Sequence, residues 1–298
     1  MHRSRKVINP AVGLELERER TLASAVETLC VGIPAHNEAA TVGQAVDAAY
    51  AGLAALGVTG EVVVAASGCT DTTAAVAAAA GARVLVVERG KGVAVRALVA
   101  ALEQDALCLL DADLEYFGVE PLVATLARPV VAGTVEAALA DLHWRPVYPQ
   151  LWFYGFFAPL AGALFPESLA ALGHTPWTGQ RAATAALWTG LVDLPDDFSV
   201  DLAINLQWVL SGARVVSLPT DDWANPQRPK PELMHQELAM MLDAAAAGGR
   251  LHRPREHYRA WFDEVHEAMA GYRPGVDHPP TFERRLLHGA ISGLMGSS

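Results

Sequence analysis

Short apolar runs alternate with helical patterns along the first 114 residues of the chain. Four of these runs have the length and composition of buried strands, at residues 29–33, 61–66, 83–87 and 106–110. Helices are indicated between them by apolar spacing over residues 42–56 and by helix-opening turns at residues 67–71 and 90–92. This fourfold recurrence predicts an α/β fold with a mostly parallel sheet flanked by helices. In such sheets, ligands bind beyond the carboxyl ends of the strands.

The second half of the chain has a weaker pattern. Residues 130–138 and 214–218 are predicted strands, and residues 201–210 and 232–247 are predicted helices. The apolar stretch 151–172 contains prolines, glycines and Glu167, so we interpret it as a buried or interfacial segment rather than a membrane span. Because aromatic residues are frequent in subunit contacts, the same stretch is a candidate homodimer interface.

Composition and charge narrow the class of protein. The chain has 298 residues, of which 52% are hydrophobic, and a net charge of −11. It can therefore form a sizeable core, but it lacks the basic surface that a nucleic-acid partner requires. The cysteines Cys30, Cys69 and Cys108 are too few and too scattered for a disulfide framework. No apolar signal segment follows the basic first residues, so we expect a cytoplasmic protein without an integral membrane segment.

An acidic pair follows the fourth predicted strand. Asp111 and Asp113 come directly after residues 106–110, so both carboxylates are expected at the carboxyl end of that strand. Two hard oxygen ligands one residue apart can share Mg²⁺ or Mn²⁺, with nucleotide phosphates filling other positions. The alternative interpretation is a solvated turn, since Asp-x-Asp is a common sequence.

Four segments, taken together, resemble the GT-A glycosyltransferases, whose fold is Rossmann-like. They are Ile-Pro-Ala-His-Asn-Glu at 33–38, Ala-Ser-Gly-Cys-Thr-Asp at 66–71, Gly-Lys-Gly at 90–92 and Asp-Ala-Asp-Leu at 111–114. The resemblance implies a nucleotide-sugar donor, a UDP- or GDP-hexose. The residues implied to bind it in these segments are Pro34, Ala35, Asn37, Glu38, Ser67, Gly90, Lys91, Asp111 and Ala112. Independently of the resemblance, glycines let backbone N–H groups approach a phosphate, while the Walker spacing of an ATPase is absent.

Within this class the chain looks most like the glucosyl-3-phosphoglycerate synthases, which are retaining enzymes that need a divalent metal. The sequences of residues 39–43 and 80–84 are similar to the corresponding segments of these synthases. The similarity continues weakly through residues 159–167 and 198–201. The resemblance implies a metal-dependent, retaining hexosyltransferase. With the residue pattern, which indicates a charged arm at the start and a helical tail at the end, we expect four parts: an N-terminal arm (1–27), a nucleotide-sugar-binding half (28–130), an acceptor-binding half (131–250) and a C-terminal helical tail (251–298).

One departure from these synthases concerns the acceptor. They carry Gly-Arg-x-Thr, which grips the acid groups of the acceptor, where this chain has Gln-Leu-Trp-Phe at 150–153. An arginine fork to a carboxylate cannot be replaced by an aromatic ring. We therefore expect a small hydroxylated acceptor (polyol, sugar or cyclitol) that stacks on Trp152 or Trp177, with Gly179 and Arg181 also on the acceptor side. The alternatives are that these aromatic residues belong to the core, or that Arg145 or Arg181 replaces the arginine that binds the acid groups of the acceptor in the synthases.

A second departure concerns the metal and the catalytic residues. The synthases carry His-Arg-Asn-Arg-Pro, where this chain has Asn225 and Arg228 in Asn-Pro-Gln-Arg-Pro. The resemblance implies that the metal ligands are Asp111, Asp113 and Asn225, and that Arg228 faces the diphosphate. The implied catalytic residues are Asp113 and Asp201, the latter acting as a base or orienting the acceptor. Asp201 could instead be a helix N-terminal residue stabilised by the helix dipole.

Two other functions are compatible with these motifs. An inverting transferase similar to dolichyl-phosphate-mannose synthase would act on a lipid phosphate. A catalytically silent protein would bind a nucleotide sugar without turning it over. This alternative is motivated by Asn225, which stands where the synthases have the histidine of His-Arg-Asn-Arg-Pro.

Overall fold

A seven-stranded sheet forms the centre of the protein. The computed structural model describes residues 26–116, 118–141, 151–220, 223–224 and 233–296. The strands lie in the order β3-β2-β1-β4-β7-β6-β8, and β7 runs antiparallel to its neighbours β4 and β6. Their bounds are β1 (Thr28–Ala35), β2 (Thr59–Ser67), β3 (Arg83–Val87), β4 (Ala106–Leu109), β6 (Ala137–Asp141), β7 (Arg181–Thr184) and β8 (Val215–Pro219). The predicted fold class, a mostly parallel sheet flanked by helices, is confirmed.

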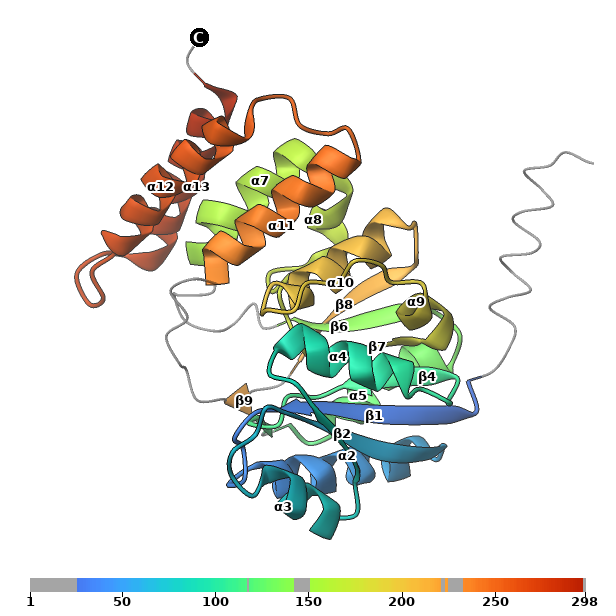
Figure 1. Ribbon diagram of the computed structural model, residues 1–298. Coiled ribbons are helices and arrows are strands. Elements are labelled where there is room, and N and C mark those ends of the chain that lie inside the picture. Colours follow the sequence, from blue (N-terminus) through green and yellow to red (C-terminus); the bar gives the residue numbers. More distant parts are fainter. Residues whose placement is uncertain (1–25, 117, 142–150, 221–222, 225–232, 297–298) are drawn as a thin grey trace, which may run out of the picture.

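Helices cover both faces of the sheet, which explains why its strands are apolar throughout. One face packs against α2 (Val42–Leu56), α3 (Thr73–Ala79) and α5 (Leu122–Val131). The other packs against α4 (Lys91–Ala100), α9 (Ala185–Thr189) and α10 (Val200–Leu210). Figure 1 shows α2 and α3 below the sheet and α4 and α10 above it. A second sheet consists of β5 (Glu115–Tyr116) and β9 (Trp223–Ala224).

Most of the predicted elements have the expected place, and one is wrong. The helix over residues 42–56 and the strand over residues 83–87 match α2 and β3. The strand expected at residues 130–138 is instead the end of α5, a turn, and the start of β6. The β-branched Val130 and Val131 suggested a strand, but they end a helix whose buried positions recur at helical spacing from Leu122 to Val130. The expected domain boundary at residue 130 therefore falls inside a helix.

The apolar stretch 151–172 folds into the core of this chain. It forms η1 (Phe153–Phe157), α7 (Ala158–Leu164) and α8 (Pro166–Leu172), and buries Phe156, Phe157 and Leu160 completely. Helix α13 (Pro279–Met295) packs against it, so that a Cβ at Gly155 would contact Leu286. Among the described residues, no helix is both long and apolar enough to cross a membrane. The homodimer contact stays a prediction, and most of the apolar side chains that suggested it are buried.

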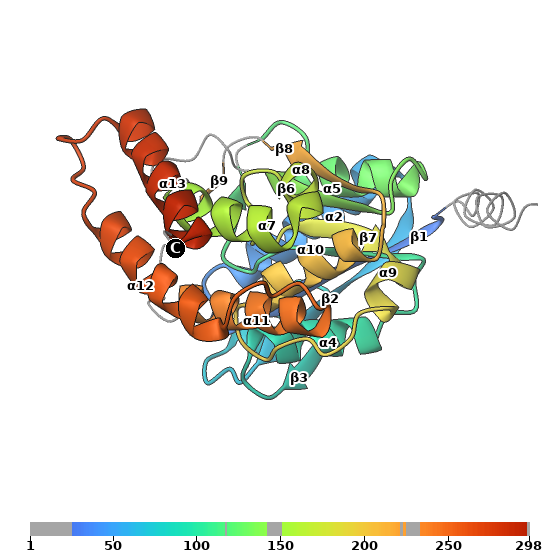
Figure 2. The ribbon, with the colours of Figure 1, turned by 90° about the horizontal axis from the view of Figure 1, so that it is seen from above.

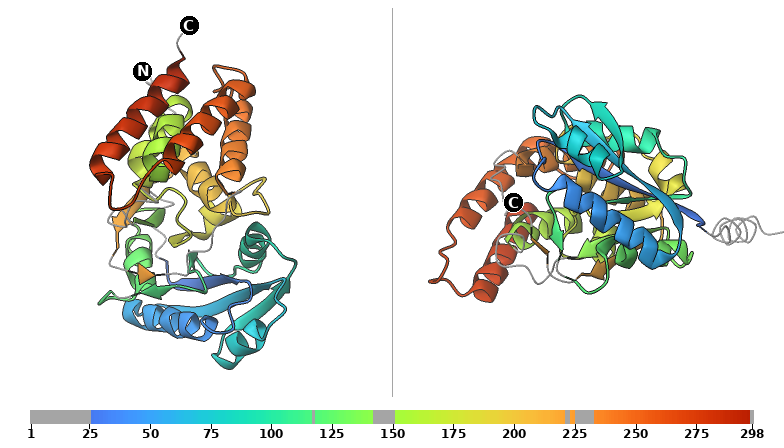
Figure 3. Two further views of the ribbon diagram at one scale, coloured as in Figure 1. Left: turned by 90° about the vertical axis from the view of Figure 1, so that its left-hand side faces the viewer. Right: turned by 90° about the horizontal axis from the view of Figure 1, so that it is seen from below.

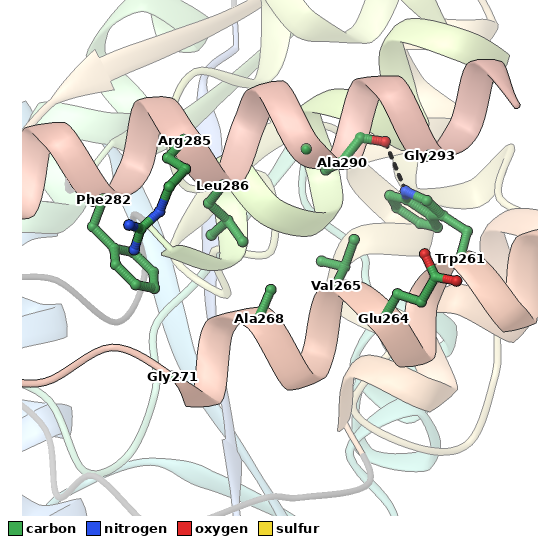
Figure 4. A pocket seen from close by; sticks show the side chains of 11 residues that line it. Trp261, Glu264, Val265, Ala268, Gly271, Phe282, Arg285, Leu286, Ala290 and Gly293 are labelled. Carbon is green, nitrogen blue, oxygen red and sulfur yellow. Dashed lines mark hydrogen bonds between the residues drawn. The ribbon is translucent and has the colours of Figure 1, made fainter. Parts of the chain in front are cut away.

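Three helices complete the C-terminal part: α11 (Leu233–Ala247), α12 (Arg255–Ala270) and α13. They lie beyond α10, at the end of the molecule opposite α2 and α3 (Figures 1 and 3), and in the view from above α12 and α13 lie to one side of the sheet (Figure 2). A cavity of about 450 Å³ opens between α12 and α13 (Figure 4). The indole N–H of Trp261 donates a hydrogen bond to the carbonyl of Ala290 (2.8 Å) across this hairpin, while Gly289 lines the cavity and faces open space. The hairpin is thus joined by packing and by this hydrogen bond.

Candidate active site

A cavity of about 350 Å³ lies where β1, β2 and β4 end, at the carboxyl edge of the parallel strands. Most of the residues predicted to bind the donor line it, together with the predicted metal ligand Asp113: Pro34, Ala35, Glu38, Ser67, Gly90, Lys91, Asp111 and Ala112. His36, Arg89, Ala94 and Phe198 line it as well. The β-strand register explains the convergence, because β1 pairs in parallel with both β2 and β4 and their ends meet at one edge.

Two of the predicted side chains hold loops together. Asn37, with φ of 56°, accepts a hydrogen bond from the backbone N–H of Thr70 (2.8 Å) and is not among the residues that line the cavity. The Ser67 hydroxyl donates to the carbonyl of Glu88 (2.8 Å) and accepts from the N–H of Gly90 (2.9 Å). Ser67 therefore fixes the turn before α4, and its hydroxyl is engaged within the protein.

The Gly-Lys-Gly turn is supported from behind by residues 192–199. The N–H of Gly92 donates to the carbonyl of Asp196 (2.9 Å), and Arg96 donates to the carbonyl of Leu194 (2.8 Å). Gly90 has φ of 150°, a conformation that residues with a Cβ rarely adopt. Nothing in the sequence indicated this supporting segment, because its contacts come from about 100 residues further along the chain, mostly through backbone carbonyls and also through an ion pair between Asp196 and Arg96.

The close approach at Gly92 leads to a stability prediction. A Cβ at this position would lie 1.8 Å from the carbonyl oxygen of Pro195, so Gly92→Ala must displace the supporting segment. We expect the variant to lose about 1–3 kcal/mol of unfolding free energy, measured by urea denaturation. Gly289→Ala is the matched control, because no atom lies within 4 Å of a Cβ there. It should gain about 0.5–1 kcal/mol from helix propensity. Equal stability of Gly92→Ala and wild type would contradict this packing.

Lys91 joins the predicted metal motif to the predicted catalytic carboxylate. Its Nζ lies 3.2 Å from Oδ1 of Asp111 and 2.6 Å from Oδ2 of Asp201. Burial alone would lower the pKa of Lys91, but the two carboxylates outweigh that effect and raise it. Lys91 is therefore a permanent positive charge at the edge of the cavity. A fixed charge of this kind suits an anionic ligand such as a diphosphate.

Arg181 lies on the other side of Asp201. It is completely buried, forms an ion pair with the Asp201 carboxylate, and donates to Asn205 Oδ1 (3.0 Å) and the Thr178 carbonyl (2.7 Å). This placement corrects the prediction of Arg181 as an acceptor contact, because its guanidinium is already paired inside the protein. Burial lowers the pKa of Arg181, against the opposing effect of Asp201. Both oxygens of Asp201 are thus engaged by cations.

Gln180 and Gly179 complete the surroundings of Asp111. The Gln180 amide donates to Asp111 Oδ2 (2.5 Å), and its carbonyl oxygen accepts from the Asp111 N–H (2.9 Å). A Cβ at Gly179 would lie 3.1 Å from Asp111 Oδ1 and from Lys91 Nζ. Gly179 was expected on the acceptor side, and it lies next to the charged centre. The sequence offered no reason to single out Gln180, since its partner is 69 residues away.

The two tryptophans that were predicted to stack on the acceptor, Trp152 and Trp177, stack on one another. The rings of Trp152 and Trp177 lie 5.0 Å apart and 24° from parallel, and Trp152 is buried. The two rings cover one another, so an acceptor could stack only on what remains open of Trp177. The turn that carries Trp177 is fixed to α10, because the Asn205 amide donates to the Pro176 carbonyl (2.8 Å).

A carboxyl group without a charged partner lies beneath this stack. Glu237 on α11 is completely buried, and neither of its oxygens has a hydrogen-bond partner within the described residues. Burial raises the pKa of Glu237 well above its usual range, and the negative charge of Asp201 adds to the effect. The nearby Trp152 indole acts in the opposite direction and is too weak to reverse it.

The raised pKa of Glu237 makes stability depend on pH. Because the native state binds this proton more tightly than the unfolded chain, the unfolding free energy falls as pH rises above about 4.3. We expect Glu237→Gln to lack this contribution, so that its stability relative to wild type improves between pH 5 and pH 8 in urea denaturation. Glu264→Gln, at an exposed position of α12, controls for the loss of one charge. A Glu237→Gln variant whose stability follows wild type at both pH values would refute the assignment.

The described residues supply part of a divalent-metal site. Asp111 and Asp113 offer hard oxygen ligands on one wall of the cavity, which suits Mg²⁺ or Mn²⁺. Within the described residues, no group of three or more His, Cys, Asp or Glu side chains could hold a metal alone. Asn225, Arg228, Gln150 and Arg145 lie outside the described residues, so their predicted roles stay predictions. The donor set thus fits a metal whose coordination is completed by further ligands such as phosphate oxygens.

Together, the sheet, the Asp-x-Asp pair at the end of β4 and the Gly-Lys-Gly turn beside it define the class of GT-A nucleotide-sugar glycosyltransferases. The chain belongs to glycosyl transferase family 2, whose model matches residues 30–185.

Curated relatives carry a more specific name. The chain is 31% identical, over an alignment of 201 positions, to glucosyl-3-phosphoglycerate synthases of Mycobacterium tuberculosis and Mycobacterium bovis, and the match covers 59% of this chain and 60% of theirs. It thus spans about 60% of the length of these relatives in the match.

Solved structures give the same picture. The Mycobacterium tuberculosis synthase in complex with Mn²⁺, UDP and phosphoglyceric acid has a TM-score of 0.63 and 27% identity, covering 82% of this chain and 84% of that one. The same enzyme with Mg²⁺ and UDP has a TM-score of 0.60 and 26% identity, covering 83% and 86%. The resemblance inferred from the motifs is thereby confirmed.

Proposed function

We propose that this protein transfers a hexose from a UDP-hexose to a hydroxyl group of a small acceptor, with Mg²⁺ or Mn²⁺ as cofactor and with retention at the anomeric carbon. The observation that carries the proposal is the position of Lys91, within 3.2 Å of Asp111 and 2.6 Å of Asp201 at the edge of the cavity. UDP is favoured over GDP because related structures contain UDP or UDP-glucose.

The residues around the cavity have separable tasks in this proposal. A divalent metal, when bound at Asp111 and Asp113, would act as a Lewis acid that stabilises the charge of the leaving diphosphate. Lys91 adds a fixed positive charge on the same side. A hydrogen bond from the Gly92 N–H to the segment 192–199 holds the backbone of residues 90–92 in place. The protein therefore directs positive charge to the place where negative charge develops during transfer.

Retention is supported by the surroundings of Asp201. An inverting enzyme needs a carboxylate that can take the proton of the attacking hydroxyl. Both oxygens of Asp201 are engaged by Lys91 and Arg181, which suits a carboxylate that orients the acceptor better than one that accepts its proton. We therefore assign Asp201 to orientation of the acceptor hydroxyl.

The acceptor is proposed to be a neutral polyol, sugar or cyclitol. Leu151 and Trp152, which precede η1, and Phe153, its first residue, carry no charge, and Arg181 is paired with Asp201 inside the protein. An acid group brought to this site without a cationic partner would cost several kcal/mol. Related structures bind phosphoglyceric acid, so the two acceptor classes need a direct comparison.

A two-stage experiment tests the proposal. Thermal shifts with UDP-, GDP-, ADP- and TDP-hexoses in Mn²⁺ should be largest for a UDP-hexose, because ligands of the native state raise its stability. UDP release is then measured with glucose, myo-inositol, glycerol and 3-phosphoglycerate, with donor hydrolysis subtracted, and the anomeric configuration of the product is read by NMR. Saturable transfer to 3-phosphoglycerate alone would refute the neutral acceptor. Donor binding without turnover of any acceptor, or turnover only with a lipid phosphate, would favour the alternative functions.

A further inference from the structure

A second large cavity, of about 750 Å³, lies between α10, α11 and the segment 192–199. Part of its lining is apolar, including Leu206 of α10 and Met240 of α11. Three carboxylates also line it, those of Asp193, Asp197 and Asp243, whereas no lysine or arginine does among the described residues. We call this cavity the α10–α11 groove. It is separate from the donor cavity and combines apolar with acidic side chains.

The carboxylates of the α10–α11 groove are only partly balanced by cations. Asp243 forms an ion pair with Arg255, and its side chain is still 69% exposed. Asp197 accepts hydrogen bonds from the N–H (2.9 Å) and the hydroxyl (2.6 Å) of Ser199, which carries no charge. Since Asp193 also lines the groove, the lining carries a net negative charge and favours a cationic occupant.

The first eight residues of the chain have the complementary composition. Arg3, Arg5 and Lys6 are followed directly by the apolar pair Val7 and Ile8, and no acidic residue precedes position 15. The chain as a whole, by contrast, has a net charge of −11. Residues 1–25 lie outside the described part of the chain, and the candidate active site makes no use of this basic run. An acidic groove with apolar walls suits such a segment.

The described chain begins within reach of the groove. The N–H of Thr28 donates to Oδ2 of Asp105 (2.9 Å), and the N–H of Ala185 donates to the carbonyl of the same residue (2.8 Å). Figures 1 and 2 accordingly show α9 at the end of the sheet where β1 starts. Val192, which lines the groove, follows Ala185 by seven residues (185 to 192) and lies within about 25 Å of it. Residues 7–25 span about 30 Å even as one helix and about 65 Å when extended, so residues 3–8 can reach the groove.

We propose that residues 3–8 of the N-terminal arm bind in the α10–α11 groove of the same chain. Arg3, Arg5 and Lys6 face its carboxylates, while Val7 and Ile8 contact its apolar walls. Tethering favours this partner over a free cation, because a linked segment is present at a high effective concentration. The bound arm braces the segment 192–199, which holds the Gly-Lys-Gly turn. The inference is independent of the proposed transferase function, because its tests require neither donor nor acceptor.

The first test uses the full chain and a zero-length carbodiimide, which joins a lysine amine to a carboxylate in contact with it. The lysines of the chain are Lys6, Lys91 and Lys230, so the products can be assigned by mass spectrometry. We expect Lys6 to be joined to carboxylates of the groove within one chain. Replacing both Arg3 and Arg5 with glutamine should lower the yield about 3- to 10-fold, the effect of two exposed ion pairs. Replacing Arg18 and Arg20 with glutamine removes the same charge from the same arm and is the matched control.

A second pair of variants tests the groove itself, because its carboxylates take part in the coupling reaction. Ala239 lines the groove at an exposed position of α11, so Ala239→Trp should fill part of it and lower the yield by a similar factor. Ala246→Trp, at another exposed position of α11 that is not among the lining residues, is the control. Thermal unfolding of each variant establishes that it is folded.

Hydrogen exchange gives a readout without coupling chemistry. Amides of residues 192–199 should exchange at least about 3-fold faster in the Arg3 and Arg5 double variant than in wild type, because local opening becomes easier when a bound segment is lost. Lower coupling in this variant and in Ala239→Trp, with both controls unchanged, supports the inference. Coupling of Lys6 mainly to carboxylates elsewhere, a yield or an exchange rate that the variants leave unchanged, or coupling only between chains that disappears on dilution overturns it.

Discussion

Replacing Asp113 with alanine is expected to lower turnover of UDP-hexose by at least about 100-fold, with little change in thermal stability. Asp113 lines the cavity at the end of β4 and is only partly buried, so its carboxylate supplies charge rather than core packing. Loss of one metal ligand removes much of the Lewis-acid stabilisation of the leaving diphosphate, which is among the largest contributions to such a reaction.

The measurement is UDP release at saturating Mn²⁺, beside a thermal unfolding curve of the same sample. Asp47→Ala, on an exposed position of α2, makes the same charge change away from the cavity and should leave turnover unaffected. Excess EDTA should reduce wild type to the level of the variant. Undiminished turnover in Asp113→Ala, or in wild type with EDTA, would rule out the Asp-x-Asp metal site.

The second large effect is expected at Arg181. Its guanidinium is completely buried beside Asp201, so Arg181→Met leaves an incompletely compensated carboxylate in the interior. Breaking a buried ion pair from one side typically costs about 3–5 kcal/mol. We expect a loss of this size in the free energy of unfolding, together with reduced turnover, because Asp201 would lose the partner that orients it.

Arg83→Met is the matched control. Arg83 also forms an ion pair, with Glu61 (2.9 Å), but its side chain is 41% exposed. Exposed pairs contribute less than about 1 kcal/mol, so this variant should unfold close to wild type. The double variant Arg181→Met with Asp201→Asn should recover part of the lost stability, since the incompletely compensated charge is then removed. Equal losses for Arg181→Met and Arg83→Met would contradict the structural role of the buried pair.

The N-terminal half of the fold follows from the residue pattern alone. A parallel sheet covered on both faces makes each central strand continuously apolar, and the turns at the strand ends collect the polar residues. Both features are local, so β1 to β4, α2 and the cavity residues could be located from the residue pattern. The same local reasoning failed at Val130 and Val131, whose β-branched side chains end a helix.

What the charged residues contact depends on how the helices and strands pack in three dimensions. An arginine at position 181 has the same appearance in a sequence whether it binds an acceptor or a buried carboxylate. Its role follows from the register of β7, an antiparallel strand of four residues that aligns Arg181 with Leu109 and Leu139 in one row. The pairing of Lys91 with Asp201 depends likewise on two helices 110 residues apart.

The environment of the buried carboxyl of Glu237 has the same origin. Helical spacing indicates that α11 has a buried face, but it does not reveal that the side chain beneath Trp152 lacks a charged partner. Local patterns report which backbone conformation a segment prefers and which face it buries. Partners distant in sequence are set by how the elements pack, and the free energy of a buried charge depends on those partners.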